Sequence, residues 1–153
     1  MKLKPPSRIT ASDYLRVVAL WQAAGLHVRP AGRDSQEAFE RQIAGGTQIA
    51  IGIETEDEGK HAGSPLLVGV VLATHDGRKG WINRLAVHPE RRRKGVAKRL
   101  IAAAEEALRA QGMDVIAALI EPDNEASLTL FMEAGYSEWP GIHYVSKRSS
   151  EED

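Results

Sequence analysis

The most informative stretch of this sequence is Leu85-Ala86-Val87-His88-Pro89-Glu90-Arg91-Arg92-Arg93-Lys94-Gly95-Val96-Ala97. It begins with apolar residues typical of a strand, and His88-Pro89 ends that strand because proline has no N–H to donate. Four consecutive cations follow, and a helix is predicted to begin at Gly95. The first amides of a helix have no acceptor within it and lie at its positive end, where they attract phosphate oxygens. This order of elements favours an anion-binding loop between a strand and a helix.

The helix predicted over residues 96–111 is strongly amphipathic, and this would anchor the loop to the core. Its apolar face consists of Val96, Ala97, Leu100, Ile101, Ala104 and Leu108. The four cations fit a solvated loop equally well, so spacing alone leaves both interpretations open. The stretch is not a P-loop, since no Gly-Lys-Ser/Thr follows a glycine-rich turn, and it has too few glycines for a dinucleotide-binding fingerprint.

Outward from this stretch the sequence predicts alternating strands and helices. Strands are expected over 8–10, 48–53, 66–74, 81–87, 115–120 and 142–147, and helices over 12–24, 35–45, 96–111 and 124–134. Three consecutive strands joined by short turns indicate an antiparallel meander. The strand–helix–strand unit over 81–120 indicates a parallel pair with a right-handed crossover. We therefore expect one mixed α/β domain over residues 1–148, a solvated acidic hairpin tip over 54–60 and a frayed acidic tail over 149–153.

Size and composition restrict the class of protein. The chain has 153 residues, of which 42% are apolar, enough for one domain with an ordinary core. A net charge of −1 and the absence of cysteine exclude a broad polyanion-binding surface, disulfides and thiolate nucleophiles. No apolar run is long enough to span a bilayer, and the N-terminus lacks a signal-peptide pattern. We expect a cytoplasmic protein without nucleic-acid or membrane partners.

Residues 81–136 resemble the GNAT acetyltransferase superfamily. Arg92-Arg93-Lys94-Gly95-Val96-Ala97 is similar to the family's Arg/Gln-x-x-Gly-x-Gly/Ala signature, and Leu85-Ala86-Val87-His88-Pro89 extends the match upstream. Downstream it includes Asn124-Glu125-Ala126 and Phe131-Met132-Glu133-Ala134-Gly135-Tyr136. The resemblance implies the GNAT fold, a mixed and mostly antiparallel sheet with a central splayed pair of parallel strands, flanked by helices. It also implies an N-acetyltransferase that moves the acetyl group of acetyl-CoA directly to an amine of a small molecule or a protein.

The resemblance also implies which residues hold acetyl-CoA. The backbone of Leu85, Ala86 and Val87 would bind the pantetheine arm, with the Val87 N–H facing the thioester oxygen as the oxyanion donor. Backbone amides from Arg92 through Ala97 would hold the pyrophosphate, and the neighbouring cationic side chains would screen the phosphates. Asn124 matches a position whose side chain contacts the pantetheine, and it is equally suited to cap the last helix.

Phe131 departs from the family pattern. Many members have a tyrosine at this position, which protonates the leaving thiolate, and phenylalanine has no proton to give. Because a thiol has a pKa near 8.5, the thiolate is a tolerable leaving group at neutral pH. The absence of the tyrosine acid should therefore slow catalysis rather than abolish it. Tyr136 and Tyr144 are candidate substitutes for the acid, although core packing explains each of them as well.

The general base and the acceptor contacts are less clearly marked. Glu121 follows a predicted strand and is a candidate base, as are His75 and Asp76, which could reach the acceptor side; a water chain serves equally well. Arg29 lies in the loop between the first two helices and could bind an anion on the acceptor, or it could simply be solvated. The histidines show no metal-ligand spacing, so no metal is expected. The loop around Arg29 and the turn at Asp76 look like those of a group of small bacterial GNAT members.

Two other functions fit the residues. A non-catalytic acyl-CoA-binding sensor of the same fold is favoured by Phe131. A nucleic-acid-binding module could use the cations of residues 91–94, but interleaved aromatic residues for stacking are missing. An exposed sheet edge would permit a homodimer, which the sequence itself does not reveal.

Overall fold

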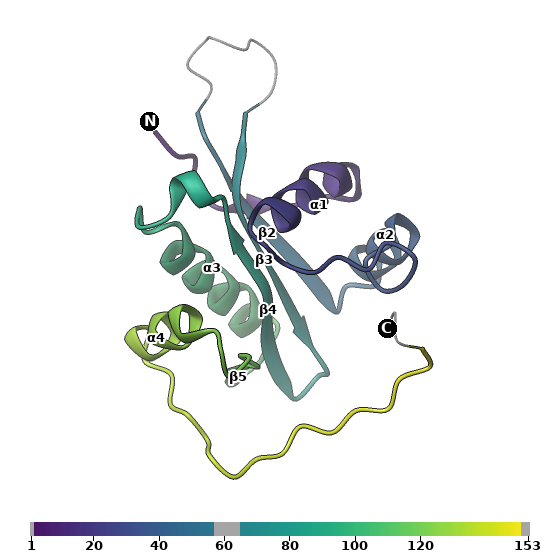
Figure 1. Ribbon diagram of the computed structural model, residues 1–153, viewed down its shortest axis with the longest axis vertical. Coiled ribbons are helices and arrows are strands. Elements are labelled where there is room, and N and C mark those ends of the chain that lie inside the picture. The colour runs from purple at the N-terminus through teal and green to yellow at the C-terminus, as the bar shows by residue number, and fades with distance from the viewer. Residues whose placement is uncertain (1, 57–64, 151–153) are drawn as a thin grey trace.

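The computed structural model describes residues 2–56 and 65–150, and these form one five-stranded sheet with helices on both faces (Figure 1). The strands are β1 (Ser7–Arg8), β2 (Gln48–Glu54), β3 (Leu67–His75), β4 (Lys79–Val87) and β5 (Val115–Ala118), in this order across the sheet. The first four run antiparallel to their neighbours, and β5 runs parallel to β4. The expected mixed, mostly antiparallel sheet is confirmed. Most of the expected acidic hairpin tip lies outside the described residues.

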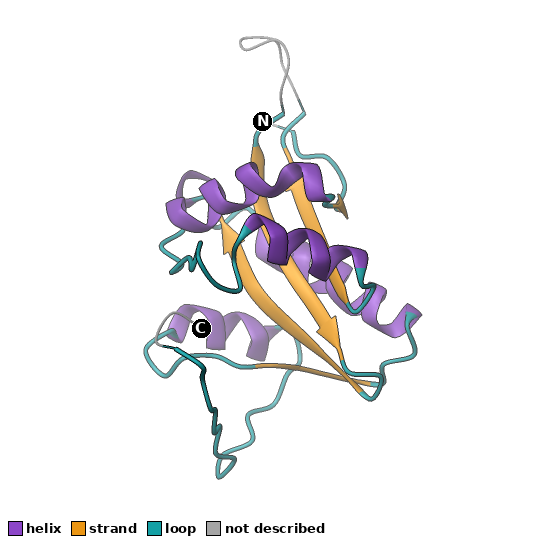
Figure 2. Ribbon diagram, turned by 90° about the vertical axis from the view of Figure 1, so that its right-hand side faces the viewer, coloured by secondary structure: helices purple, strands orange, loops and turns teal. Residues whose placement is uncertain are grey.

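The helices form two layers. One layer holds α1 (Tyr14–Ala23) and α2 (Gln36–Ala44), and the other holds α3 (Val96–Ala110) and α4 (Glu125–Glu133), as Figures 1 and 2 show. Short 3-10 turns, η1 (Ala11–Asp13) and η2 (Pro89–Arg91), precede α1 and α3. Within the described residues, no helix is both long and apolar enough to cross a membrane.

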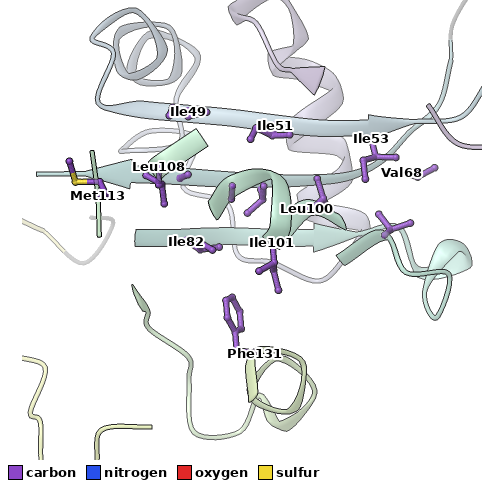
Figure 3. Packing of buried hydrophobic residues seen from close by; sticks show 14 residues of the cluster. Ile49, Ile51, Ile53, Val68, Ile82, Leu100, Ile101, Leu108, Met113 and Phe131 are labelled. Carbon is purple, nitrogen blue, oxygen red and sulfur yellow. The ribbon is translucent and has the colours of Figure 1, made fainter. Parts of the chain in front are cut away.

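The core consists of two apolar layers, one on each face of the sheet, because β3 is central and covered on both sides. On one face α3 packs Leu100, Ile101 and Leu108 onto the strands, and Phe131 reaches in from α4 (Figure 3). Gly69 of β3 lies under the start of α3, where an added Cβ would come within 2.6 Å of Val96 Cγ1. A glycine at this point lets the first turn of α3 approach the sheet closely.

The expected strand over residues 142–147 is wrong. The structure assigns no helix or strand to residues 137–150, and all of them are exposed. Residues such as Tyr144 and Val145 suit a strand, but a strand also needs a neighbour to pair with. The strand propensity of these residues predicted an extended segment, but no strand among the described residues of this chain pairs with it. Of the expected frayed tail, residues 151–153 lie outside the described part.

Candidate acetyl-transfer site

The parallel strands β4 and β5 pair over only part of their length. Pairing runs from Lys79 with Val115 to Ile82 with Ala118, after which β4 continues to Val87 alongside β3. Within the described residues no strand pairs with positions 83–87 on the β5 side. The separation predicted for the parallel pair of strands therefore begins directly after Ile82.

The backbone of β4 directs hydrogen-bonding groups into this separation. The N–H of His88 donates to the carbonyl of Val68 on β3 at 2.8 Å. Because successive residues of a strand direct their N–H and C=O groups to opposite sides, the groups of Val87 and Leu85 point away from β3, toward the unpaired side. An extended ligand can pair with these groups as a neighbouring strand would.

A β-bulge at Arg84 accompanies the separation. Leu72 of β3 is opposite Asn83 and Val70 is opposite Ala86, so one residue of β3 faces two residues of β4. Arg84 has φ 50°, in the left-handed region that non-glycine residues rarely adopt. A bulge of this kind bends its strand and re-aims the residues that follow. The sequence carries no signal for it, because an arginine in a β-branched segment does not predict positive φ.

The Arg84 side chain is fixed by three contacts on the α1 face of the sheet. Its guanidinium donates to the His27 carbonyl at 2.9 Å and to Asp34 Oδ2 at 3.2 Å. The same group lies over the Trp21 ring, 4.3 Å from its centroid. Asp34 is only 8% exposed, so this ion pair is largely withdrawn from water. Sequence reasoning missed both Arg84 and Asp34, since the first lies within an expected strand and the second directly before an expected helix.

Asp34 also organises the loop between α1 and α2. Its carboxylate accepts the Arg29 N–H at 2.9 Å, and its backbone carbonyl accepts the Tyr14 hydroxyl at 2.6 Å. The next residue, Ser35, caps α2 by accepting the Ala38 N–H at 3.1 Å. The loop that was expected to meet the acceptor is therefore tied to the bulge of β4 through one buried carboxylate.

Two further arginines of the α1–α2 loop act on Arg84 through their charges. Burial lowers the pKa of Arg84, the Asp34 charge opposes that change, and the positive charges of Arg33 and Arg29 lower the pKa further. The side of β4 that meets the α1–α2 loop therefore carries the charges of three arginines, and Asp34 is the one buried carboxylate among the described residues. The net charge of −1 for the whole chain gives no sign of this local positive charge.

The basic loop after β4 has the backbone of an anion-binding turn. Arg93 has φ 62° and Gly95 has φ 77°, and turns that contain left-handed residues can direct successive N–H groups to one side. Arg92, Arg93, Lys94 and Gly95 are exposed, whereas Val96 is buried under the first turn of α3. A Cβ added at Gly95 would meet no atom within 4 Å, so the positive φ requires a glycine here and a close contact does not. The Arg92 guanidinium reaches the Ala24 carbonyl, 3.4 Å away at the end of α1.

Phe131 and Tyr136 form an edge-to-face pair, with ring centroids 5.0 Å apart. Phe131 is 5% exposed and points from α4 toward Ile101 (Figure 3). The Tyr136 hydroxyl donates to Glu105 Oε2 at 3.1 Å. Burial and the Glu105 carboxylate raise the pKa of Tyr136, which makes it a weaker acid. Glu105 lies about 15 Å along α3 from Gly95 at 1.5 Å per residue, so this hydroxyl is held away from the end of β4.

Glu121 and Asn124 lie in the turn after β5, on the side where the strands separate. Asn124 Oδ1 accepts the Ser127 N–H at 3.1 Å, which confirms its role as the N-cap of α4. Its amide NH₂ is not required for that cap. Glu121 is exposed, and its carbonyl accepts the Asn124 N–H at 3.0 Å.

Asp76 lies at the opposite end of β4. Its Oδ1 accepts the backbone N–H groups of Lys79 and Arg78, each at 2.8 Å, and these two bonds lower the pKa of Asp76. Eight residue steps of strand separate Lys79 from Val87, which at about 3.3 Å per step is roughly 26 Å. His75 belongs to the same turn, where its Nδ1 accepts the Gly77 N–H. Both residues therefore lie at the end of β4 opposite to Val87, and the acceptor contact expected of Asp76 stays a prediction.

Comparison with known proteins agrees with this geometry. Residues 16–136 match the sequence model of the acetyltransferase (GNAT) family. An acetyltransferase of Sodalis glossinidius is 27% identical over 140 residues, covering 92% of each chain, and one of Photorhabdus laumondii is 29% identical over 126 residues, covering 82% of this chain and 81% of the relative.

Two solved structures show the same fold. The aminoglycoside acetyltransferase AAC(6')-Iy, in complex with a bisubstrate analogue of CoA and acetylneamine, has a TM-score of 0.73 at 18% identity, over 97% of this chain and 99% of that one. Glucosamine-6-phosphate N-acetyltransferase from Arabidopsis thaliana has a TM-score of 0.70 at 16% identity, over 98% and 100%. At these identities the likeness concerns the fold alone.

Proposed function

Because this chain belongs to the acetyltransferase (GNAT) family and is an acetyl-CoA-dependent N-acetyltransferase, we propose that its acceptor is an amine that also carries an anionic group. The observation that carries this proposal is the pairing of Arg84 with the buried Asp34 carboxylate, next to a loop in which the positive charges of Arg29 and Arg33 also act on Arg84. A carboxylate or phosphate on the acceptor would be attracted to these arginines, and guanidinium groups bind such anions with paired hydrogen bonds.

The coenzyme in this proposal lies along the unpaired side of β4. Its pantetheine arm pairs with the backbone of Leu85 and Val87, and its pyrophosphate rests on the amides of residues 92–97 at the start of α3. Asn124 offers its amide NH₂ to the arm. The order of strand, basic loop and helix supports this placement, since one short segment leads from the unpaired side of β4 to the first amides of α3.

The acetyl transfer is direct. The neutral amine nitrogen attacks the thioester carbonyl, a C–N bond forms, and the C–S bond breaks to release CoA as the thiolate. The Val87 N–H stabilises the oxyanion of the tetrahedral intermediate, and one such donor typically contributes about 3 kcal/mol. The proton lost by the amine goes to Glu121, directly or through water.

The leaving thiolate departs without a tyrosine acid. Phe131 has no proton, and the Tyr136 hydroxyl is bound to Glu105, so neither residue serves this step in the proposal. With a thiol pKa near 8.5, the thiolate leaves at neutral pH and takes its proton from solvent.

The acceptor class separates this chain from the aminoglycoside enzymes that share its fold. Aminoglycosides carry several ammonium groups, which the cluster of three arginines would repel. Glucosamine-6-phosphate N-acetyltransferase has the same fold, and its named substrate bears a phosphate. The fold is therefore compatible with acceptors of either positive or negative charge. The charge of the α1–α2 loop supports the anionic class.

The experiment measures CoA release with amines that differ only in the acidic group. Glucosamine 6-phosphate and glucosamine form one pair, glycine and glycinamide a second, and the aminoglycoside sisomicin is the cationic comparison. We expect the acid-bearing member of at least one pair to have the higher kcat/KM. Arg33→Gln should reduce that preference by about tenfold, as for one lost charged hydrogen bond, whereas Arg78→Gln, in the remote β3–β4 turn, should leave it unchanged. Equal rates within both pairs, or faster turnover of sisomicin, would overturn the proposed acceptor class while leaving the family assignment intact.

A further inference from the structure

A hollow of about 340 Å³ lies where β4 and β5 begin, at the end of β4 opposite to the candidate acetyl-transfer site. This β3–β4 hollow is lined by Asp76, Arg78, Lys79, Trp81 and Val115. Its volume is at the lower end of the range for small-molecule sites. Six residue steps separate Trp81 from Val87, roughly 20 Å at about 3.3 Å per step. The hollow is therefore separate from the groups proposed to hold acetyl-CoA.

The side chains of the hollow lie on the face of the sheet that carries α1 and α2. Ile82 belongs to the core under α3. Because side chains alternate along a strand, Lys79 and Trp81 project from the opposite face. On that face α1 contacts β4 farther along the strand, through Arg84, and Figure 1 shows α1 and β5 toward opposite ends of the sheet. The start of β4 and β5 thus lies beyond α1, and Val115 is 52% exposed there.

Two cations border the hollow without an ion-pair partner. Among the described residues, no carboxylate oxygen lies within 4.0 Å of the Arg78 guanidinium or the Lys79 ammonium. Asp76 is the carboxylate that lines the hollow, and its Oδ1 accepts the backbone N–H groups of both residues at 2.8 Å. Two positive charges against one negative charge leave the hollow net positive, so it attracts an anion.

Trp81 gives the hollow an aromatic wall. The side chain is half-buried, and the Lys79 Nζ lies over its ring, 5.4 Å from the centroid. A cation in this position is attracted to the ring and stands beside any ligand that packs against the indole. Val115 of β5 adds an exposed aliphatic surface. One small hollow therefore combines apolar surface with cations, which suits a planar ring that carries a negative charge.

We propose that the β3–β4 hollow binds a small aromatic anion, whose ring packs against Trp81 and Val115 and whose carboxylate or phosphate is held by Arg78 and Lys79. A guanidinium fork and an ammonium group recognise both kinds of anion by the same hydrogen bonds and charge. An aliphatic acid would leave the aromatic wall in water, and an uncharged ring would leave the two cations unpaired. This binding site does not depend on the acceptor class or on the placement of acetyl-CoA.

Titration with four small probes is the first test. Benzoate and phenyl phosphate carry the same ring and differ in the anionic group, whereas benzamide lacks the charge and acetate lacks the ring. Binding is followed through the indole N–H resonances of the full chain, which has three tryptophans. We expect benzoate or phenyl phosphate to shift the Trp81 resonance with a Kd on the order of 1–10 mM, usual for so small a ligand, and to leave Trp21 and Trp139 unchanged.

The comparison probes separate the two halves of the proposed site. Benzamide and acetate should each bind at least about fivefold more weakly than the better anion, a difference of about 1 kcal/mol. Tighter binding of phenyl phosphate would identify phosphate esters as the ligand class, and tighter binding of benzoate would identify carboxylic acids. A Trp81 resonance that responds to neither anion, or benzamide binding as tightly as benzoate, would overturn the proposal.

Substitutions then test the residues of the hollow. Lys79→Gln keeps a side chain of similar length without the charge, and it should raise the Kd of the better anion by about fivefold. Lys98→Gln is the matched control, since Lys98 is an exposed lysine of α3 that pairs with Glu133 at 3.3 Å, and its Kd should equal that of the wild type. Trp81→Leu, followed through the ring protons of the probe, should weaken binding by a similar factor. A Kd that Lys79→Gln leaves unchanged, or that both lysine substitutions raise equally, would overturn the proposal.

Discussion

Arg84 joins the two halves of the candidate site. Its backbone forms the bulge after which β4 runs without β5, and its side chain binds Asp34, which organises the loop on the acceptor side. The left-handed backbone costs on the order of 1–3 kcal/mol at a non-glycine residue. The contacts to Asp34, His27 and Trp21 offset that cost, so we regard Arg84 as a positioning residue for both substrates.

Removing the Arg84 side chain should therefore destabilise the folded protein. Arg84→Ala leaves the Asp34 carboxylate buried without its cation, and we expect the free energy of unfolding to fall by about 3 kcal/mol, the usual loss when one member of a buried pair is removed. Urea denaturation measures this loss. Arg78→Ala, at an exposed position, is the control and should change the free energy by less than about 0.5 kcal/mol. Asp34→Asn in the Arg84→Ala background should recover part of the loss. Equal stability of Arg84→Ala and Arg78→Ala would contradict the account.

Phe131 offers a test of the missing acid. If protonation of the thiolate limits the rate, Phe131→Tyr should raise kcat, because the new phenol supplies a proton donor at the position where GNAT members often have tyrosine. The gain should be largest below pH 8.5, where a free thiol is the favoured product. Phe39→Tyr is the matched control, since it adds the same hydroxyl to the other buried phenylalanine, on the opposite face of the sheet. If Phe131→Tyr, like Phe39→Tyr, does not raise kcat, another step limits turnover.

The Tyr136 hydroxyl makes a pH-dependent contribution to stability. Its pKa is raised in the folded protein, mainly by burial and then by Glu105, so the protonated form is favoured by folding. The contribution is fully present below the unfolded tyrosine pKa of about 10 and is lost as the pH rises above it. We expect the difference in unfolding free energy between wild type and Tyr136→Phe to be constant from pH 7 to 9 and to shrink above about pH 10. Urea denaturation across this range measures it, and a difference independent of pH would show that the hydroxyl is not held as described.

At the scale of elements, the start of α3 carries the proposed pyrophosphate site. Gly95 has φ 77° and open space around its Cβ position, so Gly95→Ala strains the backbone without a steric clash. The strain is worth roughly 1 kcal/mol and would shift the amides of the loop. We expect the Kd for acetyl-CoA, measured by calorimetry, to rise about fivefold or more, which is about 1 kcal/mol.

Gly46 provides a closely matched control for this change. It has φ 78° and equally open surroundings, but it lies in the turn between α2 and β2. Gly46→Ala should therefore cost similar stability and leave the Kd unchanged. An equal effect of the two substitutions on Kd would place the pyrophosphate elsewhere.

Much of this arrangement follows from local patterns. The apolar stripe of α3, the glycine before it and the Asn124 cap are all read from neighbours three or four residues apart, and the structure has them within a residue or two of the expected places. The bulge at Arg84 and its pairing with Asp34 were not predictable, because the Arg84 contacts span fifty or more positions of sequence. The strand expected over residues 142–147 failed for the same reason, since its pairing depends on something beyond its own residues.

At the scale of the whole molecule, a nearly neutral chain concentrates its positive charge where two anionic ligands are proposed. The loop after β4 is the proposed site of the coenzyme phosphates, and the region around Asp34 is the proposed site of the acceptor, on either side of one bulged strand.

The central claim is that acetyl-CoA takes the place of a strand partner along the unpaired part of β4. Backbone amide resonances of the labelled protein, followed during titration with acetyl-CoA, test it most directly. The largest shifts are predicted at Leu85, Val87 and residues 93–97, with the remote turn at Asp76 unaffected. Shifts confined to that turn or to β1, with β4 and the start of α3 unchanged, would contradict the account.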